Sequence, residues 1–66
     1  MNMFELSKTI LQRVSFDKML FRKELVKSLR WVKGDEAKTL KIWCLTKFGH
    51  LHTDVITEVF AKVAYV

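Results

Sequence analysis

The chain has 66 residues, half of them hydrophobic, and its twelve basic and seven acidic side chains give a formal net charge of +5. A chain this short forms a single domain, residues 1–66, and has little room for a substrate pocket, which argues against an enzyme. Its uncharged stretches are far shorter than the ~20 residues of a membrane-spanning helix, so we expect no membrane association. Because Cys44 is the only cysteine and the N-terminus lacks a secretory pattern, we expect a cytoplasmic protein.

The first predicted element is a helix over residues 3–14, which begins the chain. The absence of proline and the presence of only two glycines favour helices throughout. Residues 15–17 interrupt the apolar pattern and separate this helix from the next one, unless the two are continuous. The helical period places four apolar residues on its core face, with Leu11 beside them: Met3, Leu6, Ile10 and Val14.

The second predicted helix lies within residues 16–33, the stretch with the clearest helical pattern in the chain. Asp17 is its candidate N-cap, because a short carboxylate accepts hydrogen bonds from the free amides of a first turn, and Ser15 is the competing cap. Gly34 is its predicted stop, because glycine adopts the left-handed conformation at low cost. The same period predicts a core stripe of four residues: Phe21, Leu25, Leu29 and Val32.

Two further helices follow in the pattern. Asp35 is predicted to cap a helix over residues 36–48, which is apolar over most of its circumference and turns Ala37, Leu40, Cys44 and Phe48 inward. Gly49 is predicted to end that helix, residues 50–52 form a linker, and Thr53 or Asp54 caps the last helix. The predicted inward residues of the last helix are Val55, Ile56, Val59, Phe60 and Val63. The fold class is therefore all-α, a small bundle of three to four short helices.

Self-association is the first functional expectation. Small domains bury a low fraction of their surface and need a disulfide, a metal or a partner subunit for stability. One cysteine cannot form an internal disulfide, and a mean hydropathy of +0.07 is high for a small monomer. We therefore expect a homo-oligomer, specifically a dimer, that buries the apolar residues lying off the core stripes: Leu20, Trp31, Ile42, Trp43 and Leu45.

The second expectation is a basic face on the second helix. Residues 17–34 contain six basic and two acidic side chains, which is a local charge of +4. Lys23, Lys27 and Arg30 lie at i, i+4 and i+7, opposite the core stripe, with Trp31 at their edge. The face is either a solvated surface or a contact surface for an anionic partner, a protein first and a nucleic acid second.

A helix-turn-helix over residues 41–60 is a weaker alternative. Gly49 suits the turn, but Leu45 stands where a small residue normally lets the helices approach. The exposed side of the second helix would carry Asp54 and Glu58, which phosphates repel.

Other site chemistries are less favoured by the pattern. Cys44, His50 and His52 are the only candidate metal ligands, but they are spaced more widely than structural zinc ligands, so we predict no metal and no cofactor. A basic helix lying on a membrane surface is disfavoured because Glu24 and Ser28 interrupt its apolar side. No paired carboxylates, phosphate-binding glycine loop or serine nucleophile motif is evident. We therefore expect a non-catalytic interaction or regulatory module, with nucleic-acid binding through the basic face as the alternative.

Overall fold

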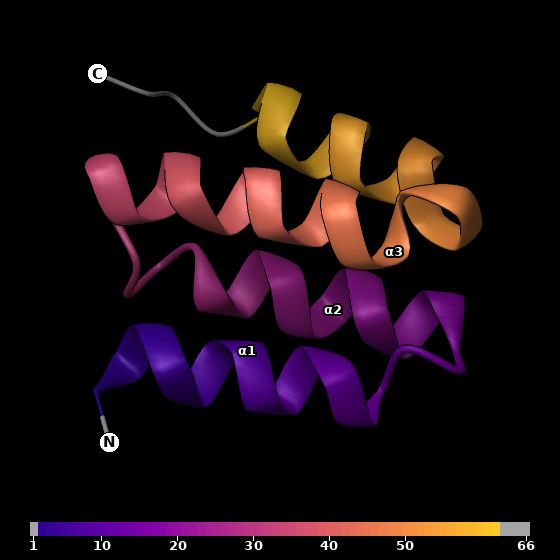
Figure 1. Ribbon diagram of the computed structural model, residues 1–66, viewed down its shortest axis with the longest axis horizontal. Coiled ribbons are helices and arrows are strands. Elements are labelled where there is room, and N and C mark those ends of the chain that lie inside the picture. The colour runs from indigo at the N-terminus through magenta and orange to yellow at the C-terminus, as the bar shows by residue number, and fades with distance from the viewer. Residues whose placement is uncertain (1, 63–66) are drawn as a thin grey trace.

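The computed structural model describes residues 2–62, and throughout that range the chain forms helices and turns without a strand. Three helices follow in order: α1 (Met3–Arg13), α2 (Lys18–Ser28) and α3 (Asp35–Lys62) (Figure 1). His52 has non-helical backbone angles and divides α3 into two halves, residues 35–51 and 53–62. The all-α prediction is confirmed, with three helices of which the last is bent. Nowhere in residues 2–62 is a helix long and apolar enough to cross a membrane.

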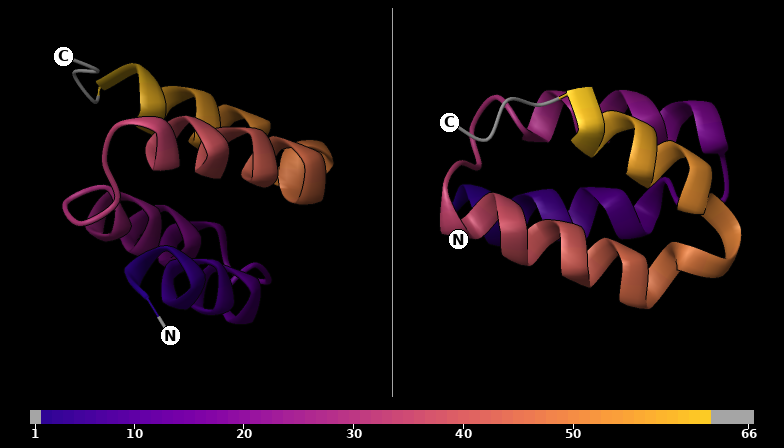
Figure 2. Two further views of the ribbon diagram at one scale, coloured as in Figure 1. Left: turned by 60° about the vertical axis from the view of Figure 1, so that its left-hand side comes forward. Right: turned by 90° about the horizontal axis from the view of Figure 1, so that it is seen from above.

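The helices form two antiparallel pairs that pack on each other. α1 and α2 make the first pair, and the two halves of α3 make the second, folded back at His52 (Figure 2). The turn between α1 and α2 and the bend of α3 lie at the same end of the bundle (Figure 1). This arrangement exposes the outer side of α2 between α1 and the second half of α3.

α1 begins where Asn2 caps it, because the Asn2 side chain accepts a hydrogen bond from the Glu5 amide at 2.8 Å. The core face predicted for α1 is wrong, because the helix is rotated about its own axis relative to the prediction. Ser7 and Leu11 are the buried residues, whereas Met3 and Leu6 are exposed. Ser7 and Ser28 line the same hollow where α1 meets α2, and their small side chains let the two helices lie close together.

α2 begins as predicted. The Asp17 carboxylate accepts hydrogen bonds from the amides of Met19 at 2.9 Å and Leu20 at 3.1 Å. All four residues of the predicted core stripe are buried: Phe21, Leu25, Leu29 and Val32.

The end of α2 differs from the prediction, because the helix stops at Ser28 and not at residue 33. The Ser28 carbonyl accepts from the amides of both Trp31 and Val32, at 3.0 and 2.9 Å, which tightens the chain into a turn. Gly34 follows with φ of +64°, the left-handed conformation expected of it. The turn keeps Val32 in the core while it directs the chain toward α3.

α3 begins one residue earlier than predicted. Asp35 is the first helical residue and not the cap, because the Gly34 carbonyl accepts from the amides of Ala37 and Lys38 at 3.1 and 3.3 Å. The inward residues predicted for both halves are buried from Ala37 to Phe60, and Val63 lies outside the described residues.

The predicted stop at Gly49 is wrong, since the helix continues through residues 49–51 and bends at His52. The Phe48 ring packs edge-on against Phe21, with centroids 5.2 Å apart, and the His52 ring stacks on Phe21 at 4.6 Å. Phe48 and His52 both contact Phe21, and a helix is the conformation that puts residues four apart on the same side. The chain therefore stays helical between them.

His52 ties the bend of α3 to the turn between α1 and α2. Its Nε2 lies 2.7 Å from the Ser15 carbonyl oxygen. Because a carbonyl can only accept, Nε2 carries the proton, and within residues 2–62 the buried Nδ1 has no hydrogen-bond partner. The predicted linker histidine is therefore a buried structural residue.

Candidate interaction surface

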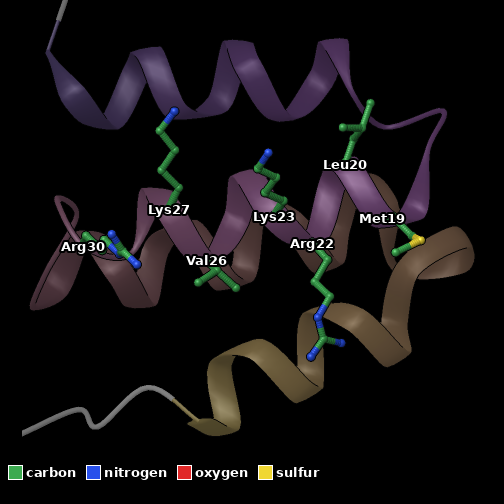
Figure 3. A pocket seen from close by; sticks show the side chains of 7 residues that line it. All are labelled: Met19, Leu20, Arg22, Lys23, Val26, Lys27 and Arg30. Carbon is green, nitrogen blue, oxygen red and sulfur yellow. The ribbon is translucent and has the colours of Figure 1, made fainter.

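The outer side of α2 carries a shallow groove of about 690 Å³, which we call the α2 groove (Figure 3). Its lining side chains recur every three or four residues, so they share one side of the helix. They are Met19, Leu20, Arg22, Lys23, Val26, Lys27 and Arg30.

The structure brings the three cations of the predicted basic face into this groove. Lys23, Lys27 and Arg30 are exposed, and none of them forms an ion pair with a described residue. No acidic side chain lines the groove. The charge of these three cations is thus not neutralised by the parts of the protein that the structure describes.

Two other bases of α2 hold the helix to α3. The Arg22 guanidinium pairs with Glu58, and the Lys18 ammonium lies 2.9 Å from the Asp54 carboxylate. The hydrogen bond from Arg22 lowers the pKa of Glu58, and the hydrogen bond from Lys18 lowers the pKa of Asp54. These two cations therefore have a structural role, unlike the three free ones.

The groove also exposes large apolar side chains, of which the sequence predicted only Leu20 to lie on a contact surface. Met19 is 81% exposed, and Leu20 and Val26 are also classed as exposed. Phe16, in the turn just before α2, is as exposed as Met19. The positions of Met19 and Val26 beside Lys23 on a helical wheel are the signal that could have placed them on this surface.

Trp31 lies in a second hollow, the Trp31 hollow, between α1 and α2. The indole is 62% exposed. Lys27 lines both this hollow and the α2 groove. The hollow measures about 170 Å³, and its other lining residues are Met3, Leu6, Ser7, Ile10, Glu24 and Ser28.

The five residues predicted for self-association lie at separate places. Leu20 lines the α2 groove and Trp31 its own hollow, whereas Ile42 and Leu45 line a third hollow of about 390 Å³ on α3, with Lys38 and Lys41. Trp43 is half-buried and packs edge-on against Phe48 at 5.4 Å, with the Lys8 ammonium 5.6 Å from its ring centroid. The α3 hollow shares no lining residue with the other two.

The residues weighed as metal ligands are not gathered together. Cys44 and His52 are buried and His50 is exposed, and within residues 2–62 no three His, Cys, Asp or Glu side chains are placed to hold a metal ion. Burial raises the pKa of the Cys44 thiol to about 12, so the thiol is protonated at neutral pH and is a poor nucleophile.

The helix-turn-helix alternative does not fit the geometry either. The two halves of α3 lie antiparallel (Figure 2), whereas the motif sets its helices at roughly 90–120°. Asp54 and Glu58 from the second half are engaged with Lys18 and Arg22 of α2.

Comparison with known proteins yields no match: neither a protein-family model, nor a curated protein, nor a solved structure is significantly similar to this chain.

Proposed function

We propose that this chain is a cytoplasmic, non-catalytic interaction module that binds an anionic partner through the α2 groove. The observation that carries the proposal is the set of free cations, Lys23, Lys27 and Arg30, next to exposed apolar side chains with no acid among them. Charged groups on a surface steer a partner of opposite charge, while apolar contact retains it. The free, buried Cys44 is in keeping with a reducing compartment.

An acidic protein fits this surface better than a nucleic acid does. The side chains between the cations are aliphatic, namely Met19, Leu20 and Val26, whereas single-stranded nucleic acids are bound by stacking on aromatic rings. Phe21, the aromatic residue of α2, is fully buried, so it is not available to stack on a base.

The test is to map binding of polyglutamate, and of duplex DNA and single-stranded RNA, by amide chemical shifts at low and near-physiological salt. We expect polyglutamate to shift the amide signals of residues 19–30, and we expect Lys27→Glu to weaken the binding of polyglutamate. Lys47→Glu is the matched control, because Lys47 is exposed on α3 and lines none of the three hollows. Shifts spread evenly over all lysines, or equal effects of the two variants, would contradict the proposal.

Nucleic-acid binding is the second candidate, and the exposure of Trp31 beside Lys27 supports it. A stacking indole next to a phosphate-binding cation is a common element of single-strand recognition. Binding of RNA that persists at near-physiological salt, quenches Trp31 fluorescence and is lost in Lys27→Glu would favour this candidate over the acidic protein.

Self-association is a separate proposal, and the Trp31 hollow supports it best. Met3, Leu6 and Trp31 expose apolar surface there, and Glu24 and Lys27 supply one charge of each sign. A two-fold interface brings the same patch of both copies together, so a mixed-charge patch can complement itself. Sedimentation equilibrium from micromolar to near-millimolar concentration should show a dimer that Trp31→Glu dissociates, and a monomer throughout would refute it.

A further inference from the structure

We infer that the occupant of the α2 groove is an acidic amphipathic helix of a partner protein, an inference that rests on the proposed function and specifies its partner. The reasons are the shape of the groove, the arrangement of apolar and charged side chains in it, and the charge that a second copy of this chain would bring.

The shape suits a rod. Six of the seven lining residues run from Met19 to Lys27 along α2, which is about 12 Å at ~1.5 Å per residue, or about two helical turns, and Arg30 follows in the turn after Ser28. The groove is shallow and open along this length (Figure 3), so it offers a track and not an enclosed cavity for a small molecule. A helix laid in such a groove contacts it through side chains one turn apart.

The two free lysines of the groove and two of its apolar side chains lie on opposite sides of its width. In Figure 3, Lys23 and Lys27 project toward α1, as Leu20 does, whereas Met19 and Val26 lie on the side of the second half of α3, where Arg22 is paired with Glu58. A partner helix that carries an apolar stripe bordered by Glu or Asp would place the stripe on Met19 and Val26. Its acids would then face Lys23 and Lys27, which have no partner among the described residues.

A second copy of this chain fits the groove poorly. Two copies packed groove to groove would bring Lys23, Lys27 and Arg30 of each against the same residues of the other, and such like-charge contacts oppose association. The apolar hollow on α3 offers no better complement, because Lys38 and Lys41 line it. Charge complementarity therefore selects an acidic partner.

The test compares two synthetic peptides of about 16 residues with the same composition. One places Leu at i, i+3, i+4 and i+7 with Glu on the flanks, and the other has the Leu positions scrambled so that no apolar stripe forms. Binding is followed by the anisotropy of a labelled peptide at near-physiological salt, and peptide helicity by circular dichroism. We expect the amphipathic peptide to bind at least about tenfold more tightly than the scrambled one, and to gain helicity when bound.

Three variants of the protein assign the binding to the groove. Lys27→Glu should weaken binding of the amphipathic peptide about tenfold or more, whereas the control Lys47→Glu should change its affinity less than about twofold. Val26→Ser should weaken binding of the amphipathic peptide and leave binding of the scrambled peptide unchanged, because only the amphipathic peptide has an apolar stripe to place on Val26. Each of these side chains is exposed, so the variants retain the core, which their unfolding curves verify.

The outcomes separate this inference from the proposed function. Equal binding of the two peptides, with both weakened by Lys27→Glu, would overturn the amphipathic helix and leave an anion-binding groove. Failure of both peptides and of polyglutamate to bind would overturn the inference and the proposed function together. Binding of single-stranded RNA or of phosphatidylserine vesicles through Lys27, with neither peptide bound, would replace the helix by that partner.

Discussion

At the scale of single residues, burial decides what the polar and reactive side chains do. Cys44 is fully buried and His52 is almost fully buried. His50, two residues before His52, is exposed to solvent. Cys and His residues that are close in sequence can suggest a set of metal ligands, but whether they could act together depends on where the fold places each side chain. In this fold one member is a small core residue and another fastens the bend of α3.

The Cys44 thiol should be unreactive in the folded protein. Its pKa is raised to about 12 because burial disfavours the thiolate, which is the reactive form. We expect negligible labelling by a disulfide reagent at neutral pH, and rapid labelling after denaturation in urea. Equal rates in the two conditions would show that Cys44 is accessible.

The same shift has a consequence at alkaline pH. A pKa raised from the ordinary 9.0 to about 12 stabilises the folded state at pH values below 9.0, and this contribution is lost as the pH rises through about 12. The free energy of unfolding, measured in urea, should therefore fall above pH 9.0 in the native protein. A Cys44→Ala variant should show a smaller alkaline loss.

Replacement of His52 should cost far more stability than replacement of His50. His52→Ala removes the hydrogen bond to the Ser15 carbonyl and the stacking on Phe21, and leaves a cavity. Such changes cost roughly 2–4 kcal/mol, whereas a change at an exposed position stays within about 0.5 kcal/mol. Urea unfolding of His52→Ala and His50→Ala measures the difference, and similar midpoints would contradict the described packing.

At the scale of elements, the two glycines have opposite roles. Gly34 has φ of +64° between α2 and α3, whereas Gly49 lies inside α3. A Cβ added at Gly49 would meet only the Thr53 Oγ1 at 3.8 Å, an ordinary contact. The conformation at each position, and not the residue type, therefore determines what a substitution does.

Alanine at these positions should change stability in opposite directions. Gly34→Ala forces a left-handed conformation on a residue with a Cβ and should destabilise by about 1–2 kcal/mol. Gly49→Ala replaces a poor helix former by the best one and should stabilise by up to about 1 kcal/mol. Thermal unfolding of the two variants measures both effects. Destabilisation by Gly49→Ala would indicate that α3 is not helical at residue 49.

At the scale of the whole molecule, ion pairs join the two antiparallel helix pairs across the exposed edge. Arg22 pairs with Glu58 and Lys18 with Asp54, so α2 is fastened to the second half of α3 at two points one turn apart. These pairs are solvent-exposed and individually weak. Their location matters because Arg22, one of the paired residues, also lines the α2 groove.

Acid should weaken this attachment. The lowered pKa of Glu58 means that its stabilisation is present above the ordinary value of 4.5 and is lost as the pH falls through its lower folded-state pKa. We expect Glu58→Gln to lower the Tm near neutral pH, with the difference from the native protein shrinking in acid. Glu24→Gln, at a residue without a described ion pair, is the control and should show no such convergence.

The lysines of the candidate site were predicted from the sequence, whereas Met19 and Val26 of its apolar part were not. The spacing of Lys23 and Lys27 placed these two side chains together, because residues at i and i+4 share a helix face. Arg30 lines the same groove although it lies in the turn after α2 and not on the helix as predicted. Met19 and Val26 belong to the same surface only because α1 and the second half of α3 leave them uncovered. Trp43, predicted to take part in self-association, is half-buried, with Phe48 and Lys8 against its ring.

The sequence by itself determined the helical class, the Asp17 cap and the core stripes of α2 and α3, because these follow from local hydrogen bonding and the 3.6-residue period. Only the tertiary structure decided where α2 ends, how α1 is rotated and where α3 bends. At Gly49 the helix penalty is about 1 kcal/mol, whereas burying a side chain such as Phe48 contributes roughly 1.5–3 kcal/mol. Contacts between residues far apart in the chain, such as His52 with Ser15 and Phe48 with Phe21, therefore outweigh the local signal and set the boundaries.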